Sequence, residues 1–428
     1  MKKPHQTLAS VILWSVISAA FIGPGTVTTA ASAGVAHGLD LLWAVVFATI
    51  ACILLQEASA RLTISTGLTF GQSLDRAFGV GAGRWLRILV GGSVVLGCAA
   101  YEAGNILGGG AGAGLLVPVS NSVLTVLLTI VAAIILFTGR RHTIGWVMTL
   151  LVALMGVAFI YLAARQPAGI GTLLKASFVP TIPIGSEMLI LGLIGTTIVP
   201  YNIFLGSGIS KGQTVSLMRT GLTISVMIGG IITAAILVAG TSVSSFQSFQ
   251  DLSEALRSAM GDIGAYALGI GLFAAGFSSA ITSPYAASII AAQVFDWDTR
   301  HQRWVWASVL AVGFAFGISG VRPIPVIIAV QVLNGLILPF LTAFLAILLN
   351  NPRLMPADQL PGKIYNTAML GIFGAVLLMS LHNIDRVLTG VRDATHLPWI
   401  GGFCLVLTAV LTGWIARIRG IKSDATTL

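Results

Sequence analysis

The sequence has little charge and few of the side chains that build soluble catalytic centres. Asp, Glu, Lys and Arg together make up 9% of its 428 residues, and only 14 residues are carboxylates. Its three cysteines, Cys52, Cys98 and Cys404, lie far apart within apolar stretches. This spacing indicates neither a disulfide framework nor a Cys-x-x-Cys metal cluster, so we expect the cysteines to be packing residues.

Motifs of ATP-driven pumps and of zinc proteases are missing as well. The chain has no Walker-type phosphate-binding loop and no His-Glu-x-x-His pair. It also lacks a basic stripe with interleaved aromatic residues, although its net charge is +9. We therefore expect a protein that is not an enzyme, uses no cofactor and binds no nucleic acid.

Long apolar stretches dominate the chain instead, since 56% of its residues are hydrophobic. A helix needs about 20 predominantly apolar residues to cross the hydrocarbon layer of a bilayer. Stretches of this length recur without a sizeable polar block, which predicts one all-α integral membrane domain over residues 1–428. The twelve predicted spans are 8–36, 41–65, 85–113, 122–138, 144–164, 187–209, 221–241, 264–294, 304–320, 325–349, 365–382 and 398–417.

Twelve crossings place both termini on one side of the membrane. With loops assigned to alternate sides, 17 of the 23 Lys and Arg residues share the side of the termini, among them Lys2, Lys3, Arg140 and Lys211. Short cytoplasmic loops carry an excess of Lys and Arg. We therefore predict a multi-pass protein of a bacterial cytoplasmic membrane with both termini in the cytoplasm.

Two short breaks interrupt apolar spans at matching points about 176 residues apart. Residues 23–26 (Gly-Pro-Gly-Thr) lie in the first span, and residues 199–202 (Val-Pro-Tyr-Asn) lie in the sixth. A helix broken inside the bilayer exposes backbone groups that lipid cannot satisfy, so it persists only where it lines a protein cavity or holds a solute. Paired breaks in two halves predict a substrate site at the midplane between inverted repeats, which is typical of a secondary transporter.

The residues of the breaks offer several kinds of ligand at one depth. Each proline lacks an amide hydrogen and frees carbonyl groups that precede it, and glycine lets a solute approach the backbone. A hydroxyl or amide group stands beside each proline. The predicted substrate-binding residues of the breaks are Gly23, Pro24, Gly25, Thr26, Val199, Tyr201 and Asn202.

Several segments together resemble NRAMP-type (natural resistance-associated macrophage protein) divalent-metal transporters. The matching segments are residues 21–26, 54–62 (Leu-Leu-Gln-Glu-Ala-Ser-Ala-Arg-Leu), 195–202 (Gly-Thr-Thr-Ile-Val-Pro-Tyr-Asn), 276–279, 331–340 and 350–355, in the family's order. The resemblance implies a LeuT-like fold with a 5+5 inverted repeat and broken helices 1 and 6. The implied repeats cover about 8–164 and 187–349, with extra helices at about 365–417. It also adds Thr196 and Gln331 to the predicted substrate site.

The chain departs from this family at the metal ligands. The family pattern is Asp-Pro-Gly-Asn in the first helix and Met-Pro-His-Asn in the sixth. Here Gly23 and Thr26 replace the Asp and the Asn of the first motif, and Val199 and Tyr201 replace the Met and the His of the second. Since a thioether helps to select softer metals and a carboxylate offsets lost hydration, we expect a divergent member whose site differs from that of its relatives.

Glu102 lies inside the third predicted span. Burying a carboxylate in a membrane is costly, so such a residue is a functional candidate by default. Asn105 shares its helix face three residues later, and residues 101–108 resemble the family's proton-route segment, which implies a coupling role for both residues. A polar clamp between helices beside Gly104 and Gly108 is the alternative. Glu57 and Arg61, spaced i,i+4, are expected to form an ion pair near the cytoplasmic surface.

Hydroxyl residues cluster in the eighth predicted span. By analogy with LeuT-like carriers, Ser278 and Ser279 are a possible sodium site together with carbonyls of the first helix. The alternative is that these hydroxyls bond to their own helix or to a neighbouring helix.

Two substrate classes follow from these features. The first is a divalent metal cation, coupled to protons or sodium and bound by carbonyls together with Thr26, Asn202 and Gln331, with Glu102 as a further candidate ligand. Such a site, built from oxygen ligands, favours a harder ion such as magnesium over manganese or iron. The second is a small organic solute, such as an amino acid or a carboxylate, received by the amides at the Gly-Pro-Gly break.

Overall fold

The computed structural model describes residues 4–138, 141–166, 168–243, 246–295, 297–389 and 396–420, and this part of the chain is helical throughout without a strand. Lys2, Lys3 and Arg140, three of the charges used to predict the topology, lie outside these ranges. The helices are α1 (Pro4–Phe21), α2 (Pro24–His37), α3 (Leu42–Thr66), α4 (Phe70–Phe78), α5 (Val80–Gly114), α6 (Asn121–Thr138), α7 (Arg141–Ala164), α8 (Ile170–Phe178), α9 (Glu187–Thr197), α10 (Pro200–Ile209), α11 (Val215–Gly240), α12 (Phe249–Met260), α13 (Asp262–Phe295), α14 (Thr299–Ile318), α15 (Pro323–Leu349), η1 (Ala357–Gln359), α16 (Lys363–Thr389) and α17 (Leu397–Gly420).

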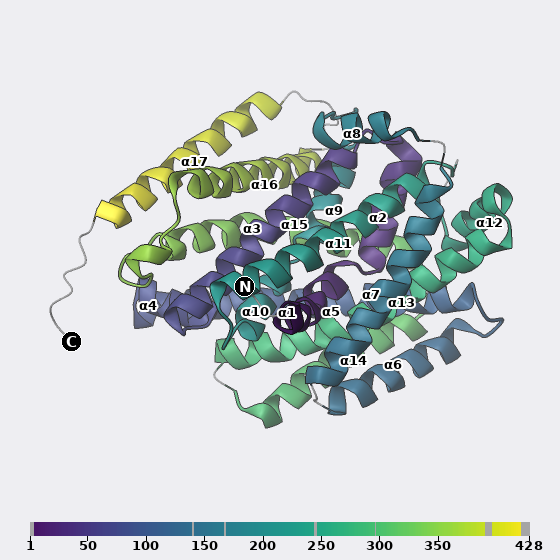
Figure 1. Ribbon diagram of the computed structural model, residues 1–428, viewed down its shortest axis with the longest axis horizontal. Coiled ribbons are helices and arrows are strands. Elements are labelled where there is room, and N and C mark those ends of the chain that lie inside the picture. The colour runs from purple at the N-terminus through teal and green to yellow at the C-terminus, as the bar shows by residue number, and fades with distance from the viewer. Residues whose placement is uncertain are drawn as a thin grey trace.

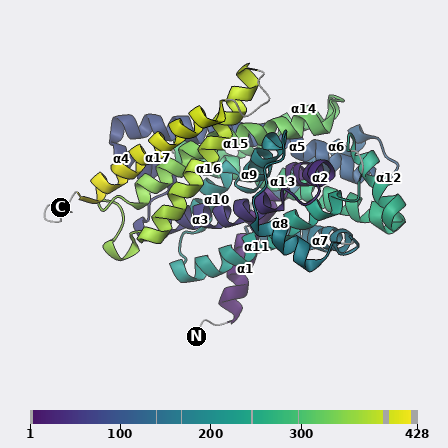
Figure 2. The same cartoon turned by 90° about the horizontal axis from the view of Figure 1, so that it is seen from above.

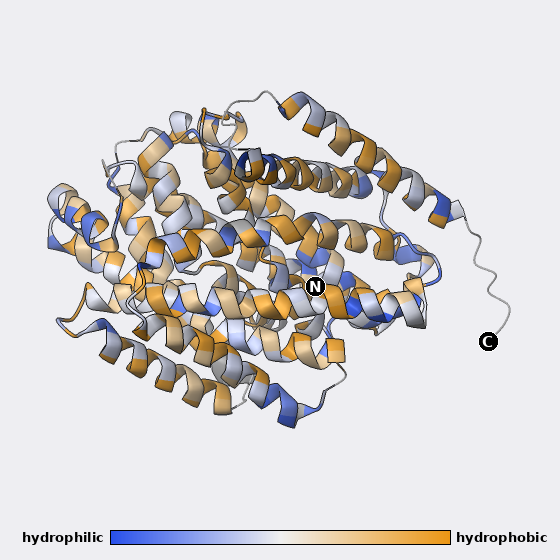
Figure 3. Cartoon of the chain, turned by 180° about the vertical axis from the view of Figure 1, so that it is seen from behind, coloured by the Kyte–Doolittle hydropathy of each residue, from blue (hydrophilic) through white to orange (hydrophobic). Residues whose placement is uncertain are grey.

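Helices occupy all twelve predicted spans. Among the described residues, nine are long and apolar enough to cross a membrane, and the bent pair α1 and α2 makes ten. The other two spans correspond to α7, whose apolar part is shorter, and to α14, which begins with polar residues. Figure 3 shows hydrophobic residues along most of the helices, as expected for a surface that faces lipid.

The interior of the bundle is built around two long helices, α5 and α13, which pack against each other (Figure 1). Glycine permits this close approach, because a Cβ at Gly276 would lie 2.3 Å from the backbone nitrogen of Gly109. Helix α1 packs against α7 and α11, whereas α16 and α17 lie side by side at one edge of the molecule (Figures 1 and 2). The breaks are therefore central, and the last two helices are peripheral.

The first predicted repeat contains α1 to α7, and the second contains α9 to α15. Contacts cross between the two broken helices: α1 touches α10, and α2 touches α9. This arrangement brings the two breaks together, as the predicted inverted repeat requires. The exact repeat boundaries stay a prediction.

Candidate functional site

Both breaks are present, and proline begins the helix that follows each of them. Pro24 and Pro200 occupy the first positions of α2 and α10, where a missing amide hydrogen costs nothing. Val199 has extended backbone angles (φ −72°, ψ 126°), as a residue before proline prefers. The first break bends the chain by 61°, whereas α9 and α10 run on as one apolar span. The sequence predicted both breaks but not this difference in bend.

Carbonyl groups at the end of α1 are bonded by side chains from other segments. The Tyr201 hydroxyl donates to the carbonyl oxygen of Ala20 over 2.7 Å, and the Thr26 hydroxyl donates to that of Phe21. Asn202 Nδ2 donates to Ile17 over 3.5 Å. Hydrogen-bond donors from α2 and α10 therefore satisfy much of the backbone that the break frees.

The serines of α13 join the same group of donors. Ser278 and Ser279 both point their hydroxyls at the carbonyl oxygen of Ala19, at 3.5 and 3.3 Å, and Ser278 also donates to Ala275 of its own helix at 3.0 Å. These hydrogen bonds to the serines' own helix and to a neighbouring helix are those of the alternative to a sodium site. A sodium role for them stays a prediction.

Gln331 of α15 covers the first break. A Cβ at Gly25 would lie 1.8 Å from Gln331 Nε2, so only glycine leaves room for this side chain. The Tyr101 hydroxyl of α5 donates to Gln331 Oε1 over 2.9 Å, and the Tyr101 ring meets the Tyr201 ring edge-on with centroids 5.5 Å apart. Tyr101 was missed as a site residue, although an aromatic side chain with a polar tip directly before Glu102 was an available signal.

The two threonines connect the breaks directly. The Thr26 and Thr196 hydroxyls lie 2.8 Å apart, joining α2 to α9. Val199 is fully buried and offers only its backbone as a polar group. Pro24 packs against α5, where a Cβ at Gly108 would lie 2.2 Å from that of Pro24. The predicted residues of both breaks are thereby gathered in one buried region.

Glu102 and Asn105 lie next to the first break on α5. Asn105 Nδ2 donates to Glu102 Oε2 over 3.2 Å, which confirms that the two side chains share a helix face. A Cβ at Gly23 would lie 3.5 Å from Asn105 Oδ1 and 2.7 Å from Ser279 Oγ. Asn105 therefore stands between the break and the buried carboxyl group, and Glu102 Oε1 has no hydrogen-bond partner in the structure.

The site has few ligands for soft metals. No group of three or more His, Cys, Asp or Glu side chains could hold a metal ion anywhere in the described ranges. Neutral oxygen atoms are present instead, on the buried side chains of Thr26, Asn202 and Gln331. Asn202 Oδ1 is buried without a hydrogen-bond partner, which makes it the amide oxygen most available to a ligand.

A second buried polar cluster surrounds Glu57 of α3. The predicted pair with Arg61 is confirmed at 3.3 Å, and Arg219 of α11 approaches the same carboxylate at 2.8 Å. The Tyr365 hydroxyl of α16 donates to Glu57 Oε2 over 2.6 Å, and its ring lies under the Arg61 guanidinium, 4.5 Å from the centroid. This cluster lies toward the Thr66 end of α3, where it connects α3 to α11 and α16. It is separate from the breaks.

Comparison with known proteins supports this arrangement. The family model described as natural resistance-associated macrophage protein-like (Nramp) matches residues 15–384. The divalent metal cation transporters MntH of Pectobacterium carotovorum and Yersinia pestis are 25% and 24% identical over 330 and 394 residues. These matches cover 73% and 86% of this chain and 78% and 93% of the relatives.

Solved structures share the fold. A manganese transporter of Eremococcus coleocola, solved in a mutant form, superimposes with a TM-score of 0.76 at 17% identity, covering 98% of this chain and 96% of the other. Mhp1, a nucleobase-cation-symport-1 family transporter, gives a TM-score of 0.62 at 13% identity, covering 97% and 94%. These matches confirm the predicted LeuT-like transporter fold, and the family model shows that the chain belongs to the Nramp-like family of membrane proteins.

Proposed function

We propose that this protein is a secondary transporter that carries a divalent metal cation through a site of neutral oxygen ligands. The observation that carries the proposal is the unpaired, buried amide oxygen of Asn202 beside two opposed helix breaks. Thr26, bonded to Thr196, and Gln331, packed against Gly25, supply further oxygen atoms at the breaks. The names of the MntH relatives support a divalent metal as the substrate class.

The ligand set favours a hard, partly hydrated ion such as Mg²⁺. Carbonyl, hydroxyl and amide oxygens are the ligands of hard cations, whereas thioether and imidazole ligands favour softer metals. The buried carboxyl group of Glu102, reached through Asn105, is the proposed proton carrier that couples transport to a gradient. The break residues and Gln331 form the proposed substrate site.

Uptake into proteoliposomes tests this proposal. Vesicles with the full chain receive Mg²⁺ or Mn²⁺ with and without a proton or sodium gradient. We expect Mg²⁺ uptake that a proton gradient accelerates. Asn202→Ala should abolish this uptake, while Asn121→Ala, at the exposed start of α6, should leave it unchanged. Saturable Mn²⁺ uptake at micromolar concentration would contradict the assignment to a hard ion.

A small organic anion is the second candidate substrate, and one observation favours it. Gly23 caps α2 without a side-chain hydrogen bond, which leaves the amides of the first turn of α2 without a side-chain acceptor. Helix N-termini attract anions through such amides and through the helix dipole. Uptake of a labelled carboxylic or amino acid, without uptake of either metal, would favour this candidate over the first.

Restoring the missing carboxylate offers a gain-of-function test. Gly23→Asp alone would crowd Ser279, so the double variant Gly23→Asp/Ser279→Ala is the better design. We expect the double variant to bind Mn²⁺ more tightly in calorimetry than Ser279→Ala alone, because a charged oxygen then joins the site. Equal affinity in the two variants would mean that position 23 does not face the substrate.

A further inference from the structure

A cavity of about 590 Å³ lies away from the breaks, at the end of the bundle where α6 and α10 finish and α14 begins. It extends along the last turns of α13 and reaches the start of α4. None of the residues proposed for the substrate site lines it. By the predicted topology, this end of the bundle faces the cytoplasm, because Lys211 follows the sixth span.

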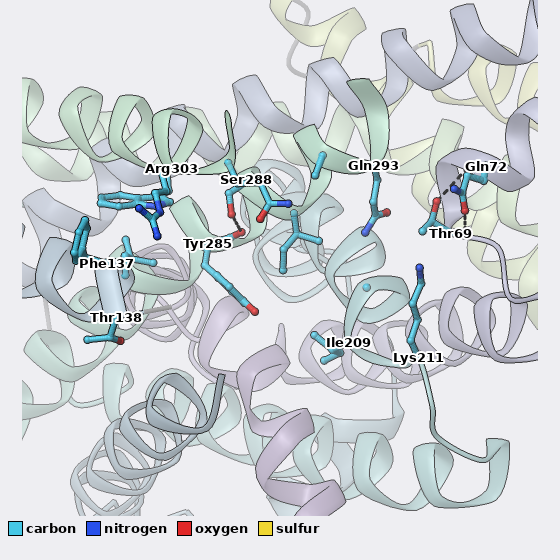
Figure 4. A pocket seen from close by; sticks show the side chains of 16 residues that line it. Thr69, Gln72, Phe137, Thr138, Ile209, Lys211, Tyr285, Ser288, Gln293 and Arg303 are labelled. Atoms are coloured by element: carbon cyan, nitrogen blue, oxygen red, sulfur yellow. Dashed lines mark hydrogen bonds between the residues drawn. The ribbon is translucent and has the colours of Figure 1, made fainter. Parts of the chain in front are cut away.

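The side chains that line this cavity are basic and neutral. Among the residues that the structure describes, Lys211 and Arg303 are the charged residues that line it, and no carboxylate does. In the described ranges neither of the two lies within salt-bridge distance of a carboxylate; the Arg303 guanidinium instead lies over the Phe137 ring, 5.4 Å from the centroid. Figure 4 shows Arg303 at one end of the pocket and Lys211 at the other.

The carboxylate of Asp298, near the cavity, caps the start of α14. Asp298 accepts hydrogen bonds from the backbone amides of His301 and Arg300 at 3.1 Å and pairs with the His301 ring at 2.7 Å. The amide of His301, followed by its ring, holds the pKa of the Asp298 carboxyl below its usual range. Asp298 therefore stabilises the start of α14 and does not line the cavity.

The polar wall of the cavity adds hydrogen-bond donors. Gln72 accepts a bond from the Thr69 backbone amide through Oε1 at 3.0 Å, so its amide nitrogen is the end left to donate (Figure 4). The opposite wall is apolar and includes Leu136, Phe137 and Trp306. A site that combines cations with an apolar wall matches a molecule that has an anionic head and a hydrocarbon tail.

Aromatic residues place this cavity at the membrane surface. Trp304, which follows Arg303 in the sequence, is 73% exposed, and Trp297, just before α14, is 41% exposed. Exposed tryptophans concentrate at the level of the lipid headgroups. Arg303 therefore lies at the level where phosphate groups of the cytoplasmic leaflet are found.

We infer that this cavity binds the phosphate headgroup of an anionic phospholipid from the cytoplasmic leaflet. Arg303, beside the apolar wall, holds the phosphate, and that wall receives the start of an acyl chain. Lys211 and Gln72, at the other end of the cavity, bind oxygen atoms of the polar group that the phosphate carries. Basic pockets between membrane helices bind anionic headgroups in this way. The site is independent of the transported substrate, since it uses none of the break residues.

Native mass spectrometry of the full chain in detergent tests the site. We expect phosphatidylglycerol or cardiolipin to stay bound while phosphatidylcholine is lost. Lys211→Gln/Arg303→Gln should weaken retention by about tenfold or more, because each cation near a lipid surface contributes to binding. Arg300→Gln is the matched control, since it removes one exposed charge from the same helix end but lies outside the cavity.

Two results would overturn the inference. One is equal retention of anionic lipid by the double variant and by the Arg300→Gln control. The other is displacement of the lipid by glycerol 3-phosphate or inorganic phosphate at the lipid's own affinity, which would assign the cavity to a soluble phosphate. Thermal unfolding of the double variant without added lipid, unchanged from that of the native chain, is expected and shows that the substitutions act on binding and not on folding.

Discussion

Each of the two breaks has a proline at its second position, but the structure satisfies the backbone groups of the two breaks differently. The carbonyls at the end of α1 depend on side chains from α2, α10 and α13, with Tyr201 contributing its bond to Ala20 at 2.7 Å. The end of α9 relies more on its own helix, where the Thr197 hydroxyl donates to Leu193 at 2.9 Å. The second break supplies donors, and the first accepts them.

This difference accompanies a difference in course, because the first break bends by 61° whereas α9 and α10 run on as one apolar span. A bent break loses more of its helical hydrogen bonds, so it needs more external partners to survive inside a bundle. The first break is therefore the part of the site whose geometry depends most on the rest of the molecule. Removing a donor that this break takes from another segment should therefore cost more stability than removing a bond within α9.

After the loss of uptake expected for Asn202→Ala, the largest effect is expected from Gly25→Ala. The added methyl group would overlap the Gln331 amide, which is flexible enough to swing away and so break its bond with Tyr101. We expect uptake to fall by about tenfold or more, as for other insertions into a packed site, with little change in thermal stability. Gly92→Ala, also in a helix and with open space around its Cα, is the control. Normal uptake by Gly25→Ala would show that Gln331 does not close the site.

Tyr201→Phe tests whether the first break depends on donors from the second. The substitution keeps the ring but leaves the buried carbonyl of Ala20 without its partner. We expect stability to fall by about 1–3 kcal/mol, the cost of an unsatisfied buried group, as measured by thermal unfolding in detergent. Thr197→Val should cost less, because the Leu193 carbonyl belongs to an intact turn of α9. Equal losses in the two variants would contradict the asymmetry between the breaks.

Much of the site could be predicted from sequence because its causes are local. Pro24 and Pro200 interrupt their helices wherever they stand, and a spacing of three places Glu102 and Asn105 on one face. The bonds of Tyr201 with Ala20 and of Tyr101 with Gln331 join residues 181 and 230 positions apart, so no local pattern could reveal them. That α9 and α10 run on as one span was hidden for the same reason, since the course of the chain at a break depends on packing as well as on the proline.

Glu102→Gln tests whether the carboxyl group next to the first break carries protons during transport. Glutamine keeps the size of the side chain and its bond with Asn105 but cannot exchange a proton. We expect a variant that folds normally and takes up its substrate at a rate that no longer changes with pH, measured in proteoliposomes over the neutral range. Glu187→Gln, which removes the carboxylate paired with Arg386 at the start of α9, is the control and should keep the pH dependence. An unchanged pH profile in Glu102→Gln would assign Glu102 to helix packing.

Ser279→Ala should have the smallest effect. It tests whether the serines of α13 act at the first break as hydrogen-bond donors or as sodium ligands. Ser278 points its hydroxyl at the same Ala19 carbonyl, so the loss of Ser279 leaves that acceptor with a donor. We expect a stability loss of about 0.5–1 kcal/mol, in the range of a single replaceable hydrogen bond, and no change in the sodium dependence of uptake. Ser319→Ala, at the exposed end of α14, is the matched control. A different result would assign the serines to ion binding: uptake by the native chain that requires sodium, and a higher sodium requirement in Ser279→Ala. In that case a cation, as well as hydroxyl donors, satisfies the carbonyl groups of the first break.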